Sequence, residues 1–146
     1  MASVIVELKK VTKYKNPRKK AMLVETNPKK ITGGLFPHEG RMYQIHTTDA
    51  SEIRGNHYHL KNAEIMMCPA GGAILELHSE EKCNLFLLDS PEKAVIVAPE
   101  TWHAVKIEAN SILMVIASKE ENETDTFEEY FECFCGQCGQ LLAPTS

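Results

Sequence analysis

Hydrophobic and polar positions alternate in short runs along this chain, and the runs recur about every ten residues. Glycine, proline and asparagine separate them, for example at Gly33-Gly34, Asp89-Ser90-Pro91 and Ala109-Asn110-Ser111. Many short strands without a long helical period are typical of an all-β sandwich or barrel. The predicted strands are Val4–Leu8, Ala21–Glu25, Arg41–Thr47, Glu52–His59, Glu64–Cys68, Ala73–His78, Asn84–Leu88, Ala94–Ala98, His103–Ile107 and Ile112–Ser118.

Two of these segments, 94–98 and 112–117, are continuously apolar instead of alternating. Such runs fit strands that are buried on both faces, with a second subunit covering the outer face. We therefore expect a homodimer whose interface is formed by the N-terminal strand or by one of these apolar sheet faces.

The chain changes character after about residue 118. Thr124 or Asp125 is suited to cap a short helix that packs an aromatic stripe against the barrel. The stripe consists of Phe127, Tyr130, Phe131 and Phe134. We expect one domain over residues 1–146, with a barrel core at about 35–118 and an acidic helix and cysteine-rich tail at 119–146.

Composition and charge narrow the functional classes. The net charge of −4 over 146 residues argues against general nucleic-acid binding. Basic residues gather in the first thirty positions and acidic residues near the end. Three interpretations are open: both regions are solvated faces, the basic residues attract a diphosphate substrate, or the two regions meet across a dimer. No signal peptide is visible, and no apolar run approaches the ~20 residues of a membrane span. We expect a cytoplasmic protein without membrane contact and with reduced cysteines.

The candidate chemistry lies in two motifs. The spacing H-x-H-x4-E joins His57, His59 and Glu64, and a strand projects both histidines from one face. His103 follows in the motif Pro99-x-x-Trp102-His103 and requires a closed β-structure to point inward. Three imidazoles and a carboxylate can bind one divalent transition metal (Zn, Fe, Ni, Cu or Mn) with positions left open for catalysis. Without metal, the same histidines suit proton transfer near neutral pH.

These motifs resemble the two signatures of the cupin superfamily, which are small jelly-roll barrels. Residues 54–59 (RGNHYH) with 99–103 (PETWH) are most similar to the sugar-nucleotide cupins, the thymidine-diphosphate 4-keto-6-deoxyhexose 3,4-ketoisomerases and related capsular-polysaccharide epimerase domains. The resemblance implies a cupin double-stranded β-helix and a small-molecule substrate such as a nucleotide sugar. These ketoisomerases usually lack the acidic ligand and work without metal, so Glu64 is a departure that restores a metal-competent set.

Four other residues are candidates for the site. The resemblance makes Tyr43 an acid/base or substrate-stacking residue. Arg54 would contact a substrate phosphate if a bulge at Gly55 turned it towards the histidines, and is otherwise a surface charge. His46 is a candidate pocket residue, although the inner face of its strand is not fixed by position. Trp102 forms either core or the wall of a substrate pocket.

The segment from Cys133 to Gly139 reads CFCGQCG and contains half of a zinc-knuckle pattern at Cys135 and Cys138. A structural zinc normally needs four ligands. Three interpretations remain: two tails share a metal across a dimer, a distant residue completes the site, or the thiols are free and form a Cys135–Cys138 disulfide under oxidation.

The leading hypothesis is an isomerase or epimerase that acts on a nucleotide-linked 4-keto sugar through an enediolate. His57 or His59 would be base and acid, with Tyr43 or His103 assisting. The alternatives are an iron-dependent oxygenase and a non-enzymatic cupin that senses a sugar or metal. Metal-bound histidines cannot also be free bases, so the metal-dependent and metal-free mechanisms exclude each other.

Overall fold

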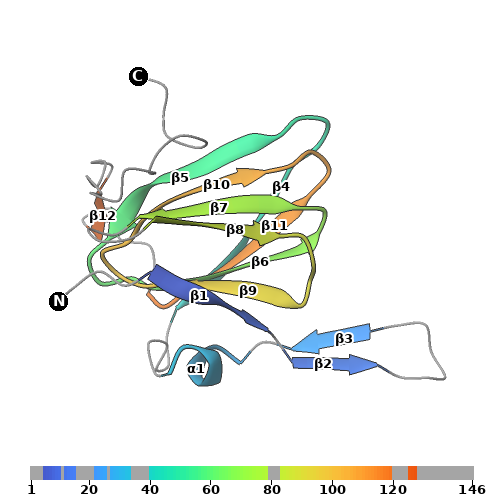
Figure 1. Ribbon diagram of the computed structural model, residues 1–146, viewed down its shortest axis with the longest axis horizontal. Coiled ribbons are helices and arrows are strands. Elements are labelled where there is room, and N and C mark those ends of the chain that lie inside the picture. Colours follow the sequence, from blue (N-terminus) through green and yellow to red (C-terminus); the bar gives the residue numbers. More distant parts are fainter. Residues whose placement is uncertain are drawn as a thin grey trace.

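A computed structural model describes residues 5–10, 12–15, 22–25, 27–33, 40–78, 83–119 and 125–127. Within these ranges, two five-stranded antiparallel sheets lie face to face, in the strand orders β1-β9-β6-β11-β4 and β12-β5-β10-β7-β8 (Figure 1). The strands are β1 (Ile5–Lys10), β4 (Arg41–His46), β5 (Glu52–His59), β6 (Glu64–Ala70), β7 (Ala73–His78), β8 (Cys83–Leu88), β9 (Lys93–Val97), β10 (Trp102–Ile107), β11 (Ile112–Ala117) and β12 (Thr126–Phe127). The all-β jelly-roll prediction is confirmed.

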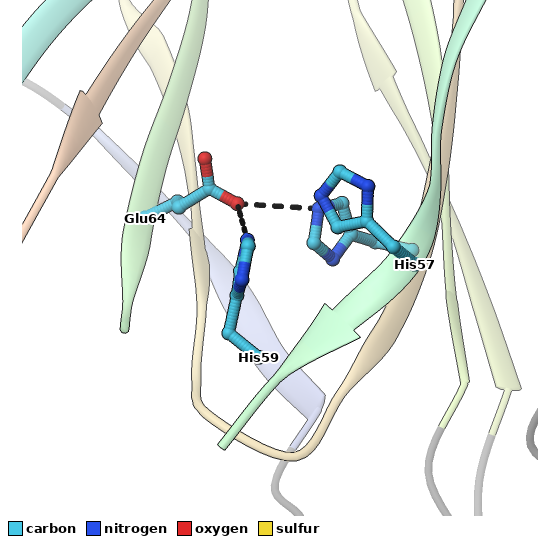
Figure 2. Close-up of side chains that lie close together, drawn as sticks. His57, His59 and Glu64 are labelled. Carbon is cyan, nitrogen blue, oxygen red and sulfur yellow. Dashed lines mark ion pairs between the residues drawn. The ribbon is translucent and has the colours of Figure 1, made fainter. Parts of the chain in front are cut away.

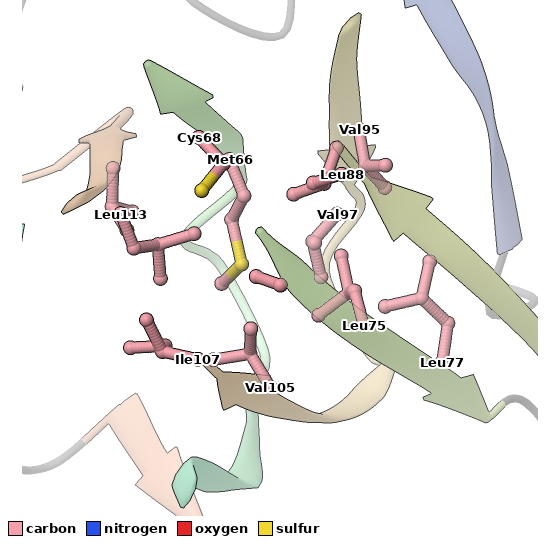
Figure 3. Packing of buried hydrophobic residues seen from close by; sticks show 12 residues of the cluster. Met66, Cys68, Leu75, Leu77, Leu88, Val95, Val97, Val105, Ile107 and Leu113 are labelled. Carbon is pink, nitrogen blue, oxygen red and sulfur yellow. The ribbon is translucent and has the colours of Figure 1, made fainter. Parts of the chain in front are cut away.

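The core lies between the two sheets because each strand sends alternate side chains inward. Figure 3 shows these apolar side chains converging from both layers, for example Met66 and Val95 from one sheet and Leu75 and Val105 from the other. The apolar segment 94–97 is buried on both faces, as its composition predicts. Ala94 on its outward face joins a second cluster with Ile65 and Met67, against which Ile31 packs.

The N-terminal region contains elements that the hydrophobic pattern does not predict. A short strand β2 (Thr12–Lys15) pairs with β3 (Met22–Glu25) in a separate two-stranded sheet. Figure 1 shows this ribbon to one side of the two large sheets. A one-turn helix, α1 (Pro28–Ile31), follows β3, and proline occupies its first helical position.

The C-terminal prediction is wrong at its start. Thr126 and Phe127 form strand β12 beside β5, where a helix was expected to begin. Phe127 stacks on Tyr58 with ring centroids 5.2 Å apart, a cross-strand contact that favours the extended form. The rest of the predicted aromatic stripe and Cys133, Cys135 and Cys138 lie outside the described residues.

Two further observations concern the cysteines and membrane-spanning helices. Cys68 is free and buried, whereas Cys83 is disulfide-bonded, which differs from the expectation that the cysteines are reduced. No helix among the described residues has the length and apolar composition needed to cross a membrane.

Candidate functional site

The two sheets meet in a polar cluster at one end of the sandwich. β5 ends there with His57 and His59, and β6 begins there with Glu64. His103 lies directly opposite His57 in the β10–β5 ladder, so both imidazoles project from the same face. The structure therefore brings together the four residues that the motif spacing grouped.

Glu64 lies at the centre of this cluster and is 3% exposed. Its Oε1 is 3.3 Å from Nε2 of His59 (Figure 2). The same oxygen is 3.2 Å from Nε2 of His103. Its Oε2 accepts a hydrogen bond of 3.0 Å from the hydroxyl of Tyr43. The ring centroid of His57 lies 4.8 Å from that of His59 and 4.7 Å from that of His103.

Backbone carbonyl groups fix the orientation of two imidazoles. Nδ1 of His59 donates to the carbonyl oxygen of Asp125 at 3.0 Å, and Nδ1 of His103 donates to that of Thr101 at 3.1 Å. Each ring therefore presents Nε2 to Glu64. An outer partner of this kind selects the tautomer and holds the ring plane.

The surroundings drive the pKa values of neighbouring imidazoles apart. Burial, and then the proximity of His103 and His59, lowers the pKa of His57 to about 4, so this ring is neutral at pH 7. Burial alone would also lower the pKa of His59, but its hydrogen bond and charge interaction with Glu64 raise it. Burial opposes ionisation of Glu64, yet interactions with His103 and His59 hold its pKa below the ordinary value. An imidazole with a lowered pKa and one with a raised pKa thus lie side by side, an arrangement suited to acid–base catalysis.

A bulge in β5 decides the direction of Arg54. His103 pairs with His57 and Ala104 with Gly55, which leaves Asn56 as an extra residue. Gly55 and Asn56 have φ of +90° and +58°, and a Cβ on Gly55 would lie 2.8 Å from the carbonyl oxygen of His103. Arg54 consequently shares a sheet face with the histidines, as the bulge hypothesis requires. It is half-exposed and ion-paired with Glu52.

A cavity of about 230 Å³ opens beside the cluster. Sequence reasoning missed six of its lining residues because charged and amide side chains near turns look like ordinary surface. The lining residues are Arg41, Tyr43, His57, His59, Lys61, Asn62, Glu64, Lys119, Asp125 and Thr126. Arg41 lies over the ring of Tyr43, with its guanidinium carbon 4.7 Å from the ring centroid.

Three predicted substrate residues, Arg54, His46 and Trp102, are not among the residues that line this cavity. The ladder with β11 turns Tyr43 and Ile45 towards the core, so His46 occupies the outer face of β4, where it contacts Gln44 at 3.0 Å. Trp102 is buried in a cluster on the outer face of β10. His78 packs against Trp102, with ring centroids 5.0 Å apart, and pairs with Glu76 at 2.7 Å.

Comparisons with known proteins agree with this geometry. Residues 4–135 match the family model described as FdtA: WxcM-like, C-terminal. A TDP-4-oxo-6-deoxy-α-D-glucose-3,4-oxoisomerase of Aneurinibacillus thermoaerophilus is 32% identical over 91 residues, which cover 62% of this chain and 66% of that enzyme, just under two thirds of its length.

Solved structures show the same architecture. A double mutant of the 3,4-ketoisomerase QdtA of Thermoanaerobacterium thermosaccharolyticum, in complex with TDP, has a TM-score of 0.73 and 25% identity, covering 86% of this chain and 88% of that one. The TDP-fucose-3,4-ketoisomerase WlaRA of Campylobacter jejuni has a TM-score of 0.72 and 18% identity, over 85% and 89% of the two chains, and supports the fold alone.

Two antiparallel sheets enclosing a cluster of histidines and one carboxylate define a cupin. Within that class, the match over residues 4–135 places the chain in the FdtA, or WxcM-like C-terminal, family.

Proposed function

We propose that this protein is an isomerase of a nucleotide-linked 4-keto sugar. The proposal rests on one observation: a cavity in a member of this family is lined by a neutral imidazole, His57, next to one with a raised pKa, His59. The relatives named for 3,4-isomerisation of TDP-linked keto sugars support it.

The proposed reaction moves a carbonyl group by one carbon. His57 removes the proton from C3, which the adjacent ketone acidifies, and leaves an enediolate across C3 and C4. His59 supplies a proton at C4, and transfer of the hydroxyl proton from O3 to O4 completes the 3-keto product. Tyr43 and His103 assist by holding Glu64 and the two imidazoles in place. General acid–base catalysis of this kind contributes roughly 10²–10⁴-fold to a rate.

The cavity supports an anionic sugar substrate. Its volume lies below the roughly 300–1,000 Å³ of pockets that enclose drug-sized ligands, so it suits the sugar portion alone. Arg41, Lys61 and Lys119 line it and provide positive charge for a diphosphate. The nucleotide would then lie outside the cavity.

Deuterium uptake tests the reaction directly. The purified protein is incubated in heavy water with TDP-4-keto-6-deoxyglucose, the sugar bound in a variant of QdtA, and the product is followed by mass spectrometry and NMR. We expect substrate-dependent incorporation at C4 together with the 3-keto product. Absence of exchange over a panel of keto-sugar nucleotides would refute the proposal.

We further propose that His57, His59, Glu64 and His103 can hold one divalent transition-metal ion. Their ligand atoms lie within 4.8 Å of one another. Atoms bound to one ion at about 2.1 Å are at most about 4.2 Å apart, so only a small inward movement is needed. Oε1 of Glu64 is buried and faces Nε2 of both His59 and His103, and the Nδ1–H groups of these two histidines are held by backbone carbonyls, as in metal sites. A bound ion would supply Lewis acidity.

Elemental analysis separates the metal-free and metal-dependent mechanisms, since histidines bound to an ion cannot also act as free bases. We expect protein purified without added metal to contain up to one Zn, Fe, Ni or Mn per chain, and a Glu64→Gln variant to contain several-fold less. Equal metal content in both would contradict the site. Full isomerase activity after chelation assigns catalysis to the free histidines, whereas stoichiometric iron with oxygen consumption favours an oxygenase.

Four expectations remain predictions: a homodimer, a cytoplasmic location, no binding of membranes or nucleic acids, and a single domain over residues 1–146.

A further inference from the structure

The turn that joins β5 to β6 is held by a carboxylate from the far end of the chain. Oδ1 of Asp125 accepts hydrogen bonds from the backbone amides of Leu60 at 3.0 Å and Lys61 at 3.1 Å, and Oδ2 accepts one from Asn62 at 3.0 Å. Asp125 is only 9% exposed. A buried carboxylate with three amide donors forms a strong, directional anchor.

The same residue contacts the site through its backbone. Its carbonyl oxygen accepts the Nδ1–H of His59, and the next two residues form β12 by pairing Thr126 with His59 and Phe127 with Tyr58. The side chain of Asp125 therefore fixes the turn, while its main chain fixes the imidazole that ends β5.

A second attachment holds the other half of the turn. The hydroxyl of Ser118 accepts the amide of Ala63 at 2.8 Å, and Oδ1 of Asn62 accepts the amide of Lys119 at 3.1 Å. Residues 60–63 thus have little freedom of their own. This matters because the turn links His59 in one sheet to Glu64 in the other.

We propose that Asp125 is a positioning residue for the proposed isomerase site, acting through His59. It holds the ring with Nδ1–H turned out towards the main chain and Nε2 turned in towards Glu64. Outer partners of histidines are worth roughly 10–100-fold in activity, because a small displacement of a catalytic group weakens proton transfer. The expected change in kcat rests on the proposed function. The expected orientation of the His59 ring rests on geometry alone.

The test compares three variants of the full chain. Asp125→Ala removes all three acceptor contacts, whereas Asp125→Asn keeps one oxygen for Leu60 and Lys61. Asp89→Ala is the matched control, because it removes an exposed aspartate and its 2.7 Å pair with Lys93 in the turn after β8. Ladder register places that turn at the opposite end of the sandwich from His103.

Two readouts distinguish positioning from general destabilisation. For Asp125→Ala we expect kcat to fall about 10–100-fold with KM changed less than about threefold, an intermediate fall for Asp125→Asn and none for the control. In ¹⁵N NMR of chelated protein, the protected Nδ1 proton of His59 should be present in wild type and the control, weakened in Asp125→Asn and lost in Asp125→Ala.

Retention of the Nδ1 signal in Asp125→Ala, or a kcat equal to that of the control, overturns the proposal. If Asp125→Ala does not fold, Asp125→Asn decides by the same criteria. If wild type isomerises no keto sugar, the proposed function fails, and the NMR comparison alone decides whether Asp125 positions His59.

Discussion

Replacement of His57 by asparagine should reduce kcat for keto-sugar isomerisation by about 10²–10⁴-fold, the usual contribution of a general base. Asparagine is similar in size and polarity but cannot take up a proton. Burial and the neighbouring imidazoles keep His57 neutral at pH 7, since they lower its pKa to about 4. Steady-state kinetics and substrate-dependent deuterium uptake measure the loss.

His46→Asn is the matched control for this experiment. His46 is exposed on the outer face of β4, bonded to Gln44 and away from the cavity lining. We expect its kcat to stay within about twofold of wild type, because surface substitutions rarely disturb a distant site. Equal losses of kcat in both variants would show that His57 is not the general base. Circular dichroism would show whether either variant is misfolded.

The second large effect is expected on stability, from Glu64→Gln. The carboxylate lies between Nε2 of His59 and Nε2 of His103 and accepts a hydrogen bond from the hydroxyl of Tyr43. Removing the charge from this buried position should lower the free energy of unfolding at pH 7 by about 1–3 kcal/mol. Urea denaturation of chelated protein measures the change. Glu52→Gln, which breaks only the exposed pair with Arg54, should cost less than about 1 kcal/mol.

The same variant should alter the response to acid. The pKa of Glu64 is lowered, so its contribution is present above pH 4.5 and is lost as the pH falls towards the folded value. His57 acts in the same direction, because the unfolded ring takes up a proton below pH 6.5 and the folded ring resists until about 4. His59 opposes both, since its contribution is present below pH 6.5 and is lost as the pH rises through its raised value.

Wild type should therefore lose stability steeply below pH 4.5, and Glu64→Gln should lose it less steeply, because it has no carboxylate to protonate. Parallel denaturation midpoints between pH 3 and 7 would contradict this account of Glu64.

Strands were predictable where both periodicity and turn residues mark them. β5 and β7 have the predicted bounds, because alternation and flanking turns agree there. β2 was missed since its sequence Thr-Lys-Tyr-Lys carries little apolar signal. β12 was taken for a helix because an aromatic spacing suited one, whereas its observed conformation follows from pairing with β5, a contact between residues far apart in sequence.

The metal-competent residues were predictable because a motif and strand alternation group them, as His57 and His59 show. The faces of Tyr43 and His46 could not be assigned, since both faces of β4 carry polar residues and only pairing with β11 decides between them. Asp125 was predicted only as one of two alternative helix caps, with Thr124, and its contact with the turn after β5 spans more than sixty positions. No local pattern encodes such a contact.

The bulge at Gly55 and Asn56 gives β5 two halves with opposite alternation. Deleting Asn56 would remove the extra residue but leave Gly55 and Arg54 opposite the same partners in β10, so Arg54 would keep the face it shares with the histidines. A substitution that abolished the bulge at constant chain length would instead shift the pairing of residues 52–54 by one position and move Arg54 to the opposite face. The bulge is therefore what allows two residues an odd number of positions apart, Arg54 and His57, to project from one side of the same strand.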